Sequence, residues 1–193
     1  LALLSSNKFK PKLFIYIYMT NKTLMIHELR KPLIIDPNLF LTFDDGLYTQ
    51  YEYAKHLENQ KIFFISSGII CPEKSIQSSR FITCGNAHKE AFRGNMENYM
   101  TLDQMLELPL GAHSHYHQNL NKFERLVDKI SWIKQDTDEM LEFWLKYFNS
   151  VPTSFCFPYN DDLDGLYKAI LSKSYGFTDF YGSERINIDD ILV

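Results

Sequence analysis

Apolar positions along the chain fall into short runs separated by polar or helix-like segments. A run of this length, bounded by turn-forming residues, is typical of a strand buried in a sheet. From residue 38 onward such runs alternate with segments whose apolar residues recur at helical spacing. The pattern predicts strands at 39–43, 61–65, 110–113, 153–157 and 177–181.

The predicted helices differ in length and in how their ends are marked. The longest apolar stripe extends over 123–148 with i, i+3, i+4, i+7 spacing, which indicates one helix or two in tandem. A helix is expected over 48–59, and Thr101 and Gln104 form a capping-box pattern that opens a short one. Asp161 or Asp162 is expected to cap a further helix that Gly176 ends. Residues 66–100 are polar and irregular, which suggests a functional loop or small elements.

Strands that alternate with helices predict an α/β fold with parallel strands, either an open doubly wound sheet or a barrel. Both arrangements gather functional residues at the carboxyl ends of the strands. We expect residues 38–193 to form one domain and residues 1–37 to be an extension or the first strands. The apolar run 13–19 follows three lysines, but it is short for a secretory signal and alternates like a buried strand.

Composition narrows the class of protein. The 193 residues are 45% hydrophobic and 23% charged, as in globular proteins, so disorder and fibrous structure are excluded. The net charge of −4 carries no basic run, which argues against binding of nucleic acid. No segment is long and apolar enough to be a predicted membrane span. Three separated cysteines without a C-x-x-C pair suit a reducing compartment, and a cytoplasmic location is expected.

Two segments that follow predicted strands carry candidate chemistry. The segment Thr42-Phe43-Asp44-Asp45-Gly46 places two carboxylates at a strand end. The conformational freedom of Gly46 would let both side chains point into the same cleft. Taken alone, however, Asp-Gly is a common turn signal. His113 and His117 are i, i+4 neighbours, and one helical turn would present both imidazoles on one face while His115 points elsewhere. Two histidines and one carboxylate leave room for a water, as in a catalytic zinc site.

A third segment, Phe155-Cys156-Phe157-Pro158-Tyr159-Asn160, ends a predicted strand with proline and says little alone. In this order, however, the three segments resemble the polysaccharide deacetylases, the NodB-homology carbohydrate esterases of family four. Residues 42–46 resemble the family's T-F-D-D-G motif, 113–117 its H-[S/T]-x-x-H motif, and 155–160 its third motif. The amino-acid sequence of residues 111–117 resembles that of intracellular family members linked to surface-polysaccharide or O-antigen synthesis.

The resemblance implies a distorted (β/α) barrel with fewer than eight strands and a divalent metal, usually zinc. It implies that Asp45, His113 and His117 hold the metal, that Asp44 is the general base, and that Ser114 steadies the histidine loop. It also implies that the Tyr159 N–H stabilises the oxyanion. The implied partner is an acetylated polysaccharide or its sugar precursor, and we expect Tyr116 and Pro158 to contact it.

This chain departs from the family pattern at two points. Cys156 stands where the family commonly has an arginine that orients the base, and Arg185 is the candidate substitute. No histidine follows His117, so the usual general acid has no counterpart, and His88, His115 or water stay open for that role.

The leading hypothesis is therefore a metal-dependent deacetylase that removes an acetyl group, foremost an N-acetyl group, from a sugar. Two alternatives stay open. One is an amidase acting on a non-sugar C–N bond. The other is a carbohydrate-binding relative that has lost turnover.

Overall fold

A curved sheet of parallel strands forms the centre of the molecule. The computed structural model of the chain describes residues 23–191, so the apolar run 13–19 lies outside the described residues. Among them are seven strands in the order β6-β5-β4-β3-β2-β1-β7. The strands are β1 (Thr23–Ile26), β2 (Phe40–Phe43), β3 (Lys61–Ile65), β4 (Leu110–Ala112), β5 (Ser154–Cys156), β6 (Asp179–Tyr181) and β7 (Ile186–Asn187).

Every neighbouring pair in this sheet is parallel, which confirms the expected distorted (β/α) barrel with fewer than eight strands. The inner strands are almost continuously apolar because helices and loops cover both faces. Phe43 of β2 stacks on Phe63 of β3 with ring centroids 4.6 Å apart, and both side chains are fully buried. Residues 23–26 lie inside the sheet as β1, while the domain boundary at residue 38 stays a prediction.

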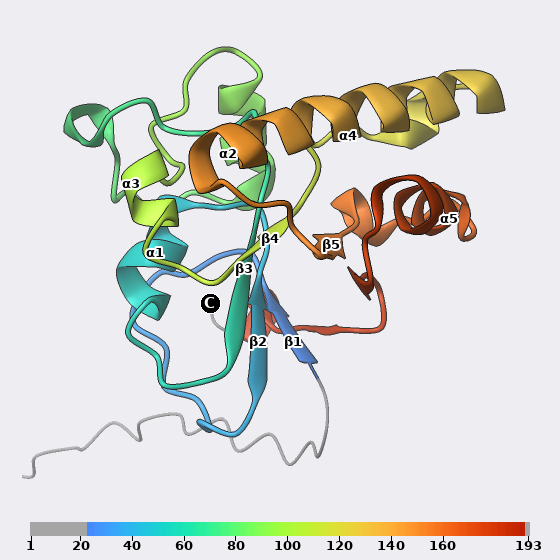
Figure 1. The fold of residues 1–193 in the computed structure, drawn as a ribbon. Helices are drawn as coiled ribbons and strands as arrows, with labels where there is room; N and C mark the ends of the chain where they lie inside the picture. The colour runs from blue at the N-terminus through green and yellow to red at the C-terminus, as the bar shows by residue number, and fades with distance from the viewer. Residues whose placement is uncertain (1–22, 192–193) are drawn as a thin grey trace, which may run out of the picture.

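Helices connect the strands and cover the sheet. They are α1 (Tyr48–Ala54), α2 (Cys84–Ala91), α3 (Leu102–Met105), α4 (Leu126–Phe148) and α5 (Leu166–Ile170). Short turns complete the chain: η1 (Lys74–Ile76), η2 (Leu120–Lys122), η3 (Pro158–Asn160), η4 (Leu171–Tyr175, a π-helical turn) and η5 (Asp189–Ile191). In Figure 1, α4 crosses the top of the view, with α1 to the left and α5 to the right of the strands.

The helix boundaries test the sequence predictions. The long stripe forms the single helix α4, and Thr101 and Gln104 form the predicted capping box at α3. Gly176 ends the predicted final helix with φ +78°, as expected. The predicted cap at Asp161 or Asp162 is wrong, because α5 begins only after Gly165. Asp161 Oδ1 instead accepts a hydrogen bond from the Leu163 N–H (2.9 Å), which holds a turn and delays the helix.

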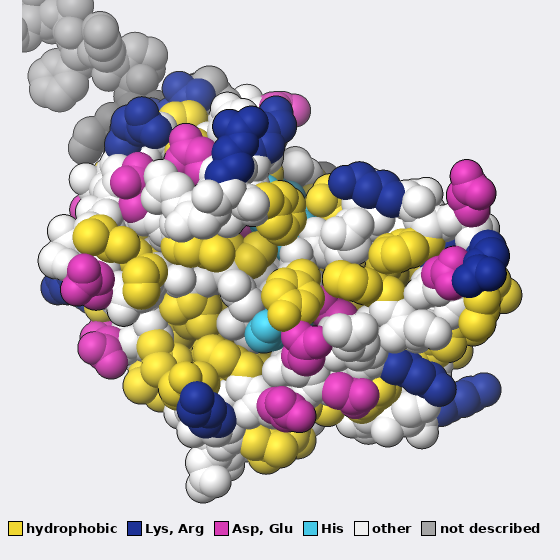
Figure 2. All heavy atoms as spheres, turned by 90° about the horizontal axis from the view of Figure 1, so that it is seen from above, with side chains coloured by type: hydrophobic (Ala, Val, Ile, Leu, Met, Phe, Trp, Pro, Cys, Tyr) yellow, Lys and Arg dark blue, Asp and Glu magenta, His cyan; other side chains and the backbone are white. Residues whose placement is uncertain are grey.

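The face of the molecule seen in Figure 2 carries mixed side chains. Lys and Arg side chains are interspersed with Asp and Glu, and histidine shows only as small areas between larger side chains. None of the helices in residues 23–191 has the length and apolar character needed to cross a membrane. Buried polar side chains gather instead at the carboxyl ends of β2, β3 and β4, where sheets of this class hold their functional sites.

Candidate active site

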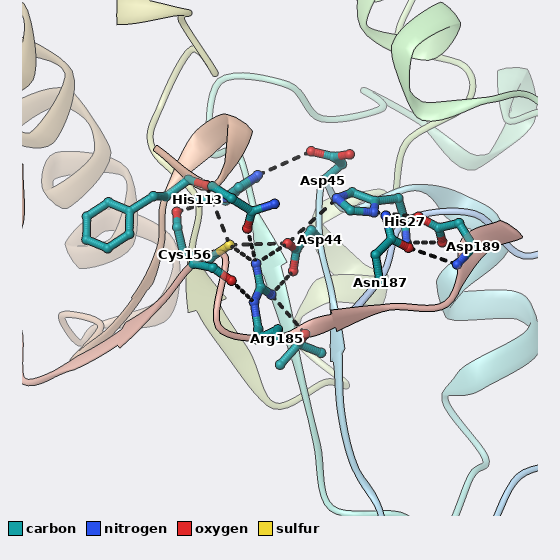
Figure 3. A network of polar contacts seen from close by, with 12 residues as sticks. His27, Asp44, Asp45, His113, Cys156, Arg185, Asn187 and Asp189 are labelled. Atoms are coloured by element: carbon teal, nitrogen blue, oxygen red, sulfur yellow. Dashed lines mark hydrogen bonds and ion pairs between the residues drawn. The ribbon is translucent and has the colours of Figure 1, made fainter. Parts of the chain in front are cut away.

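The two carboxylates after β2 line one pocket of about 420 Å³ but have different partners. Asp44 continues the strand, since its N–H donates to the Ile26 carbonyl (3.0 Å), whereas Asp45 and Gly46 both have positive φ, +81° and +76°. This turn separates the directions of the two side chains. Figure 3 shows Asp44 facing Arg185 and Asp45 facing His113.

Arg185 holds Asp44 by a bidentate ion pair. Its Nη1 donates to Asp44 Oδ1 (2.8 Å) and its Nη2 to Oδ2 (2.7 Å), and Nη2 also lies 3.0 Å from Cys156 Sγ. Arg185 directly precedes β7. It contacts Asp44, which lies 141 positions earlier in the sequence. Arg185, the predicted substitute, thus lies beside Cys156 at the end of β5. Burial raises the pKa of Asp44, but the hydrogen bonds and charge of Arg185 outweigh it and hold that pKa below its ordinary value.

Three histidines surround Asp45. From Asp45 Oδ1 the Nε2 atoms of His117, His113 and His88 lie 3.2, 3.3 and 3.7 Å away. Burial raises the pKa of Asp45, yet the neighbouring imidazoles of His113 and His117 outweigh it and hold that pKa well below the ordinary value. Burial lowers the pKa of His117 and of His88, so both imidazoles are neutral near pH 7 and offer a lone pair.

This donor set fits a divalent metal. Asp45 Oδ1 is buried without a hydrogen-bond partner among the described residues, although three imidazole nitrogens crowd around it. The donor atoms of Asp45, His88 and His117 all lie within 4.8 Å of one another. An ionised carboxylate beside neutral imidazoles is the ligand chemistry of zinc. His113, the remaining predicted ligand, approaches Asp45 Oδ1 to 3.3 Å, and its donor atom also lies near those of Asp44 and Cys156.

The histidine loop reaches this arrangement without the predicted helical turn. Residues 113–117 are irregular, and Ser114 and His117 have φ of +66° and +52°. Ser114 Oγ accepts a hydrogen bond from the His117 N–H (2.9 Å), which closes the loop. His115 points away, as expected, with its Nδ1 2.8 Å from Ser67 Oγ.

The histidine loop is also held from α4 by a residue that the sequence reasoning missed. Asp136 accepts hydrogen bonds from the backbone N–H groups of His115 (2.8 Å) and Tyr116 (2.9 Å), and its side chain is buried. The sequence did carry a signal for this residue. Asp136 is a carboxylate on the same helix face as the buried residues Ile133, Thr137 and Met140.

His27 is a second residue that the sequence reasoning missed. It follows β1, and its Nδ1 lies 2.7 Å from Asp189 Oδ2 while its Nε2 faces Asp44 Oδ2 at 3.8 Å (Figure 3). Burial lowers the pKa of His27, but the Asp189 hydrogen bond and the charges of Asp45 and Asp44 raise it to about 9. No motif marked His27, because its partners come from distant parts of the chain.

The remaining predicted site residues divide into two groups. Tyr159 lines the pocket from η3 with φ +60°, and its ring lies 4.8 Å from that of His117. Tyr116 and Pro158 are not brought to this pocket: Tyr116 is 39% exposed beside Trp132, and Pro158 is buried at a separate small cavity. Their contact with substrate stays a prediction.

Backbone strain is concentrated at this site. Eight non-glycine residues in the described part of the chain have positive φ, and four of them are Asp45, Ser114, His117 and Tyr159. Each such residue costs about 1–3 kcal/mol unless its surroundings compensate. Strain at these positions is a feature of sites in which geometry serves function.

Comparison with known proteins gives matches in structure only. No family model matches the sequence, and no curated protein matches it. The deacetylase domain of BpsB from Bordetella bronchiseptica superposes with a TM-score of 0.53 at 12% identity, over 86% of this chain and 93% of that one. IcaB from Ammonifex degensii gives 0.52 at 12%, over 87% and 92%.

A de-N-acetylase from Aggregatibacter actinomycetemcomitans gives a TM-score of 0.51 at 14% identity, over 77% of this chain and 68% of that one. Likeness at such identities shows a shared fold. The chain thus has the fold of these deacetylase domains, and its chemistry has to be argued from its own side chains.

Proposed function

We propose that this protein is a metal-dependent deacetylase that removes an acetyl group, foremost an N-acetyl group, from a sugar of a polysaccharide or its precursor. The observation that carries the proposal is the division of the adjacent carboxylates, with Asp44 held by Arg185 and Asp45 directed at histidines, in one pocket. That division supplies a metal ligand and a proton acceptor side by side. Solved deacetylase domains with this fold support the proposal.

Asp45, His113 and His117 would hold the metal. When bound, a divalent cation such as Zn²⁺ supplies Lewis-acid polarisation of the acetyl carbonyl and lowers the pKa of water to about 7. Asp44 is placed to accept the proton of the attacking water, since Arg185 keeps it ionised and oriented. The Tyr159 backbone N–H is the proposed donor to the developing oxyanion.

His27 is the proposed general acid. Its Nε2 faces the pocket beside Asp44, and its Nδ1 is fixed by Asp189. In the metal-free protein its pKa is raised to about 9, foremost by the hydrogen bond to Asp189, and that hydrogen bond favours a proton on the imidazole that can be given to the leaving amine. His27 thus fills the role for which the sequence offered only His88, His115 or water.

The rim of the pocket suits a sugar. Tyr159 and Phe92 both line it. The exposed fraction is 53% for Tyr159 and 59% for Phe92. Exposed aromatic rings beside a polar pocket offer flat apolar faces against which sugar rings stack. We propose, as the finer part of the function, a cytoplasmic role on a precursor of a surface polysaccharide, with a substrate panel to decide between precursor and polymer.

Acetate release from N-acetylated and O-acetylated sugars, together with metal content, tests the proposal. Wild-type protein should bind about one zinc per chain and release acetate. Asp44→Asn should keep the metal and lose roughly 10²- to 10⁴-fold in rate, the usual contribution of a positioned proton acceptor. His117→Ala should lose the metal itself.

Asp103→Asn and His56→Ala, both exposed, are the matched controls and should change neither quantity. Hydrolysis that survives Asp44→Asn unchanged would contradict the assigned base. Metal binding and glycan binding without acetate release would instead indicate a relative that has lost turnover.

A further inference from the structure

His88 belongs to an element that lies outside the three sequence motifs. It sits in α2, within the long 66–100 connection between β3 and β4, and is only 7% exposed. Its ring lines the same pocket as Asp45 and lies 4.1 Å from the His117 ring. The connection thus brings a third imidazole to the candidate metal centre.

The orientation of this imidazole is fixed from behind. His88 Nδ1 lies 3.0 Å from the Cys84 carbonyl oxygen, an acceptor, so Nδ1 carries the proton and Nε2 carries the lone pair. His113 has the same arrangement, with its Nδ1 2.8 Å from the Cys156 carbonyl oxygen. A backbone carbonyl on the remote nitrogen is the usual support of a metal-bound histidine.

The free nitrogen of His88 has no partner in the described part of the chain. His88 Nε2 is buried there without a hydrogen bond, and so is the Asp45 Oδ1 that it faces. A buried polar atom without a partner destabilises the folded state. A histidine with a purely structural role would have this nitrogen paired, whereas here both orphaned atoms face the same space.

The separations also match shared coordination. Ligands about 2.0–2.1 Å from one zinc are roughly 3.3 Å apart at a tetrahedral angle and about 3.6 Å apart at 120°. The three nitrogens lie 3.2, 3.3 and 3.7 Å from Asp45 Oδ1. His88 therefore lies at coordination range from Asp45, as the two motif histidines do, and its donor atom is also within 4.8 Å of that of His117.

We propose that His88 is a fourth protein ligand of this metal, beside Asp45, His113 and His117. The inference rests on the metal site of the proposed function and deepens it. Zinc accepts a fifth ligand, so four protein donors still leave a position for water. The metal would then tie the 66–100 connection to the ends of β2 and β4.

α2 is anchored firmly enough to present a ligand. Ala87 and Ala91 are buried in a small apolar cluster with Leu47, Ile69 and Tyr99. The Cys84 N–H at the start of the helix donates to Glu28 Oε1 (2.9 Å), which joins α2 to the segment after β1. Placement on an anchored helix favours a defined ligand over a loosely held side chain.

Zinc affinity by chelator competition, together with the visible spectrum of the Co²⁺ form, tests the proposal. His88→Gln and His88→Ala should weaken zinc binding at least about 10-fold and change the cobalt band intensities. X-ray absorption of the wild-type zinc protein should show three imidazoles, and of the variants two. The exposed His56→Gln is the matched control and should leave all readouts unchanged.

The outcomes separate this inference from the proposed function. Unchanged affinity and cobalt spectrum in a folded His88 variant, or two imidazoles in the wild-type protein, would overturn the His88 assignment and leave the deacetylase proposal standing. A wild-type protein that binds no zinc or cobalt would overturn both. The wild-type absorption measurement decides the matter even where a variant fails to fold.

Discussion

At the scale of single residues, two neighbours in sequence have different surroundings, which supports the different roles proposed for them. Asp44 and Asp45 are both buried and both have a pKa below the ordinary value, but a guanidinium contacts one and imidazoles contact the other. Loss of the ion pair between Arg185 and Asp44 would leave a buried charge without a partner, which is strongly destabilising. In acid-base sites, different environments around two carboxylates allow the two groups to take different roles.

His27 gives a pH-dependent prediction for stability. Its pKa is raised from 6.5 to about 9, so the folded state holds a proton that the unfolded state has released at pH 8. The stabilisation is complete below pH 6.5 and is lost as pH rises towards 9, with a total of about 3 kcal/mol. Urea unfolding of metal-free wild type and His27→Gln, in chelator, should give stabilities that converge over this range.

The exposed His56→Gln is the control, because it removes a histidine that lies outside this pocket. A wild-type stability that rises between pH 6.5 and 9 relative to His27→Gln would contradict the assigned proton. The comparison is made without metal because a bound cation near Asp45 would offset the carboxylate charge that raises the pKa of His27.

The sequence predicted those site residues whose partners are local. Asp45, His113 and His117 were found from short motifs, since a strand end followed by Gly46 and an i, i+4 histidine pair are visible within a few positions. His27 was not found, because its partner Asp189 is 162 positions away. His88 was recognised only as a residue of a long loop, since nothing in its neighbourhood shows that α2 reaches Asp45.

At the scale of elements, α4 supports the histidine loop as well as covering the sheet. Asp136 offers two carboxylate oxygens to the N–H groups of His115 and Tyr116. Asp136→Asn replaces one acceptor oxygen by an NH₂ donor, so one of these two backbone N–H groups would face another donor and lose its hydrogen bond. We expect zinc affinity to fall about 10-fold, measured by chelator competition, because the loop that carries His117 is loosened.

Glu142→Gln makes the same acid-to-amide change on the exposed side of α4 and should leave zinc affinity unchanged. Equal effects of the two substitutions would refute a specific role for Asp136. A fall in stability without a fall in zinc affinity would show that α4 supports the fold but does not position the loop.

Gly111 in β4 permits close approach to β3. A Cβ at this position would lie 2.6 Å from Phe64 Cδ1 and 2.9 Å from Ile62 Cδ1, and Phe64 is fully buried. Gly111→Ala should therefore destabilise the protein by about 1–3 kcal/mol in urea unfolding. Gly85→Ala in α2, where a Cβ meets nothing within 4 Å, should be neutral or stabilising by at most about 1 kcal/mol. Similar effects of both substitutions would argue against steric crowding at Gly111.

The long helix and the short strands β4, β5 and β6 were predicted, whereas the two strands β1 and β7 were not placed. α4 follows directly from its apolar stripe, whereas β7 has only two residues and β1 precedes the region in which strands and helices alternate. The start of α5 was misplaced because Asp161 can cap a helix or close a turn, and the local sequence does not decide between them. The sheet class was predicted from the alternation of strands and helices, but the position of β7 beside β1 was not.

At the scale of the whole molecule, the candidate metal centre joins segments that are far apart in sequence. It joins the end of β2, the loop after β4 and α2. A metal that binds only the folded state at 100 times its dissociation constant adds about 2.7 kcal/mol of stability. For a chain of this size, chelation should lower the melting temperature by roughly 5–10 °C.

Thermal unfolding followed by circular dichroism measures this shift, and added zinc should restore the original melting temperature. His117→Ala should melt at the same temperature with and without chelator. A chelator effect that persists in His117→Ala would place the stabilising metal elsewhere in the molecule.

The position of β7 has a consequence for biosynthesis. Arg185 and Asp189 flank this strand, yet they hold Asp44 and His27, which are made 141 and 162 positions earlier. While the chain emerges from the ribosome, those two groups have no partners, and a buried carboxylate without its cation is strongly unfavourable. The pocket is therefore among the last parts to become native, and a nascent fragment that stops before residue 185 can complete neither pair.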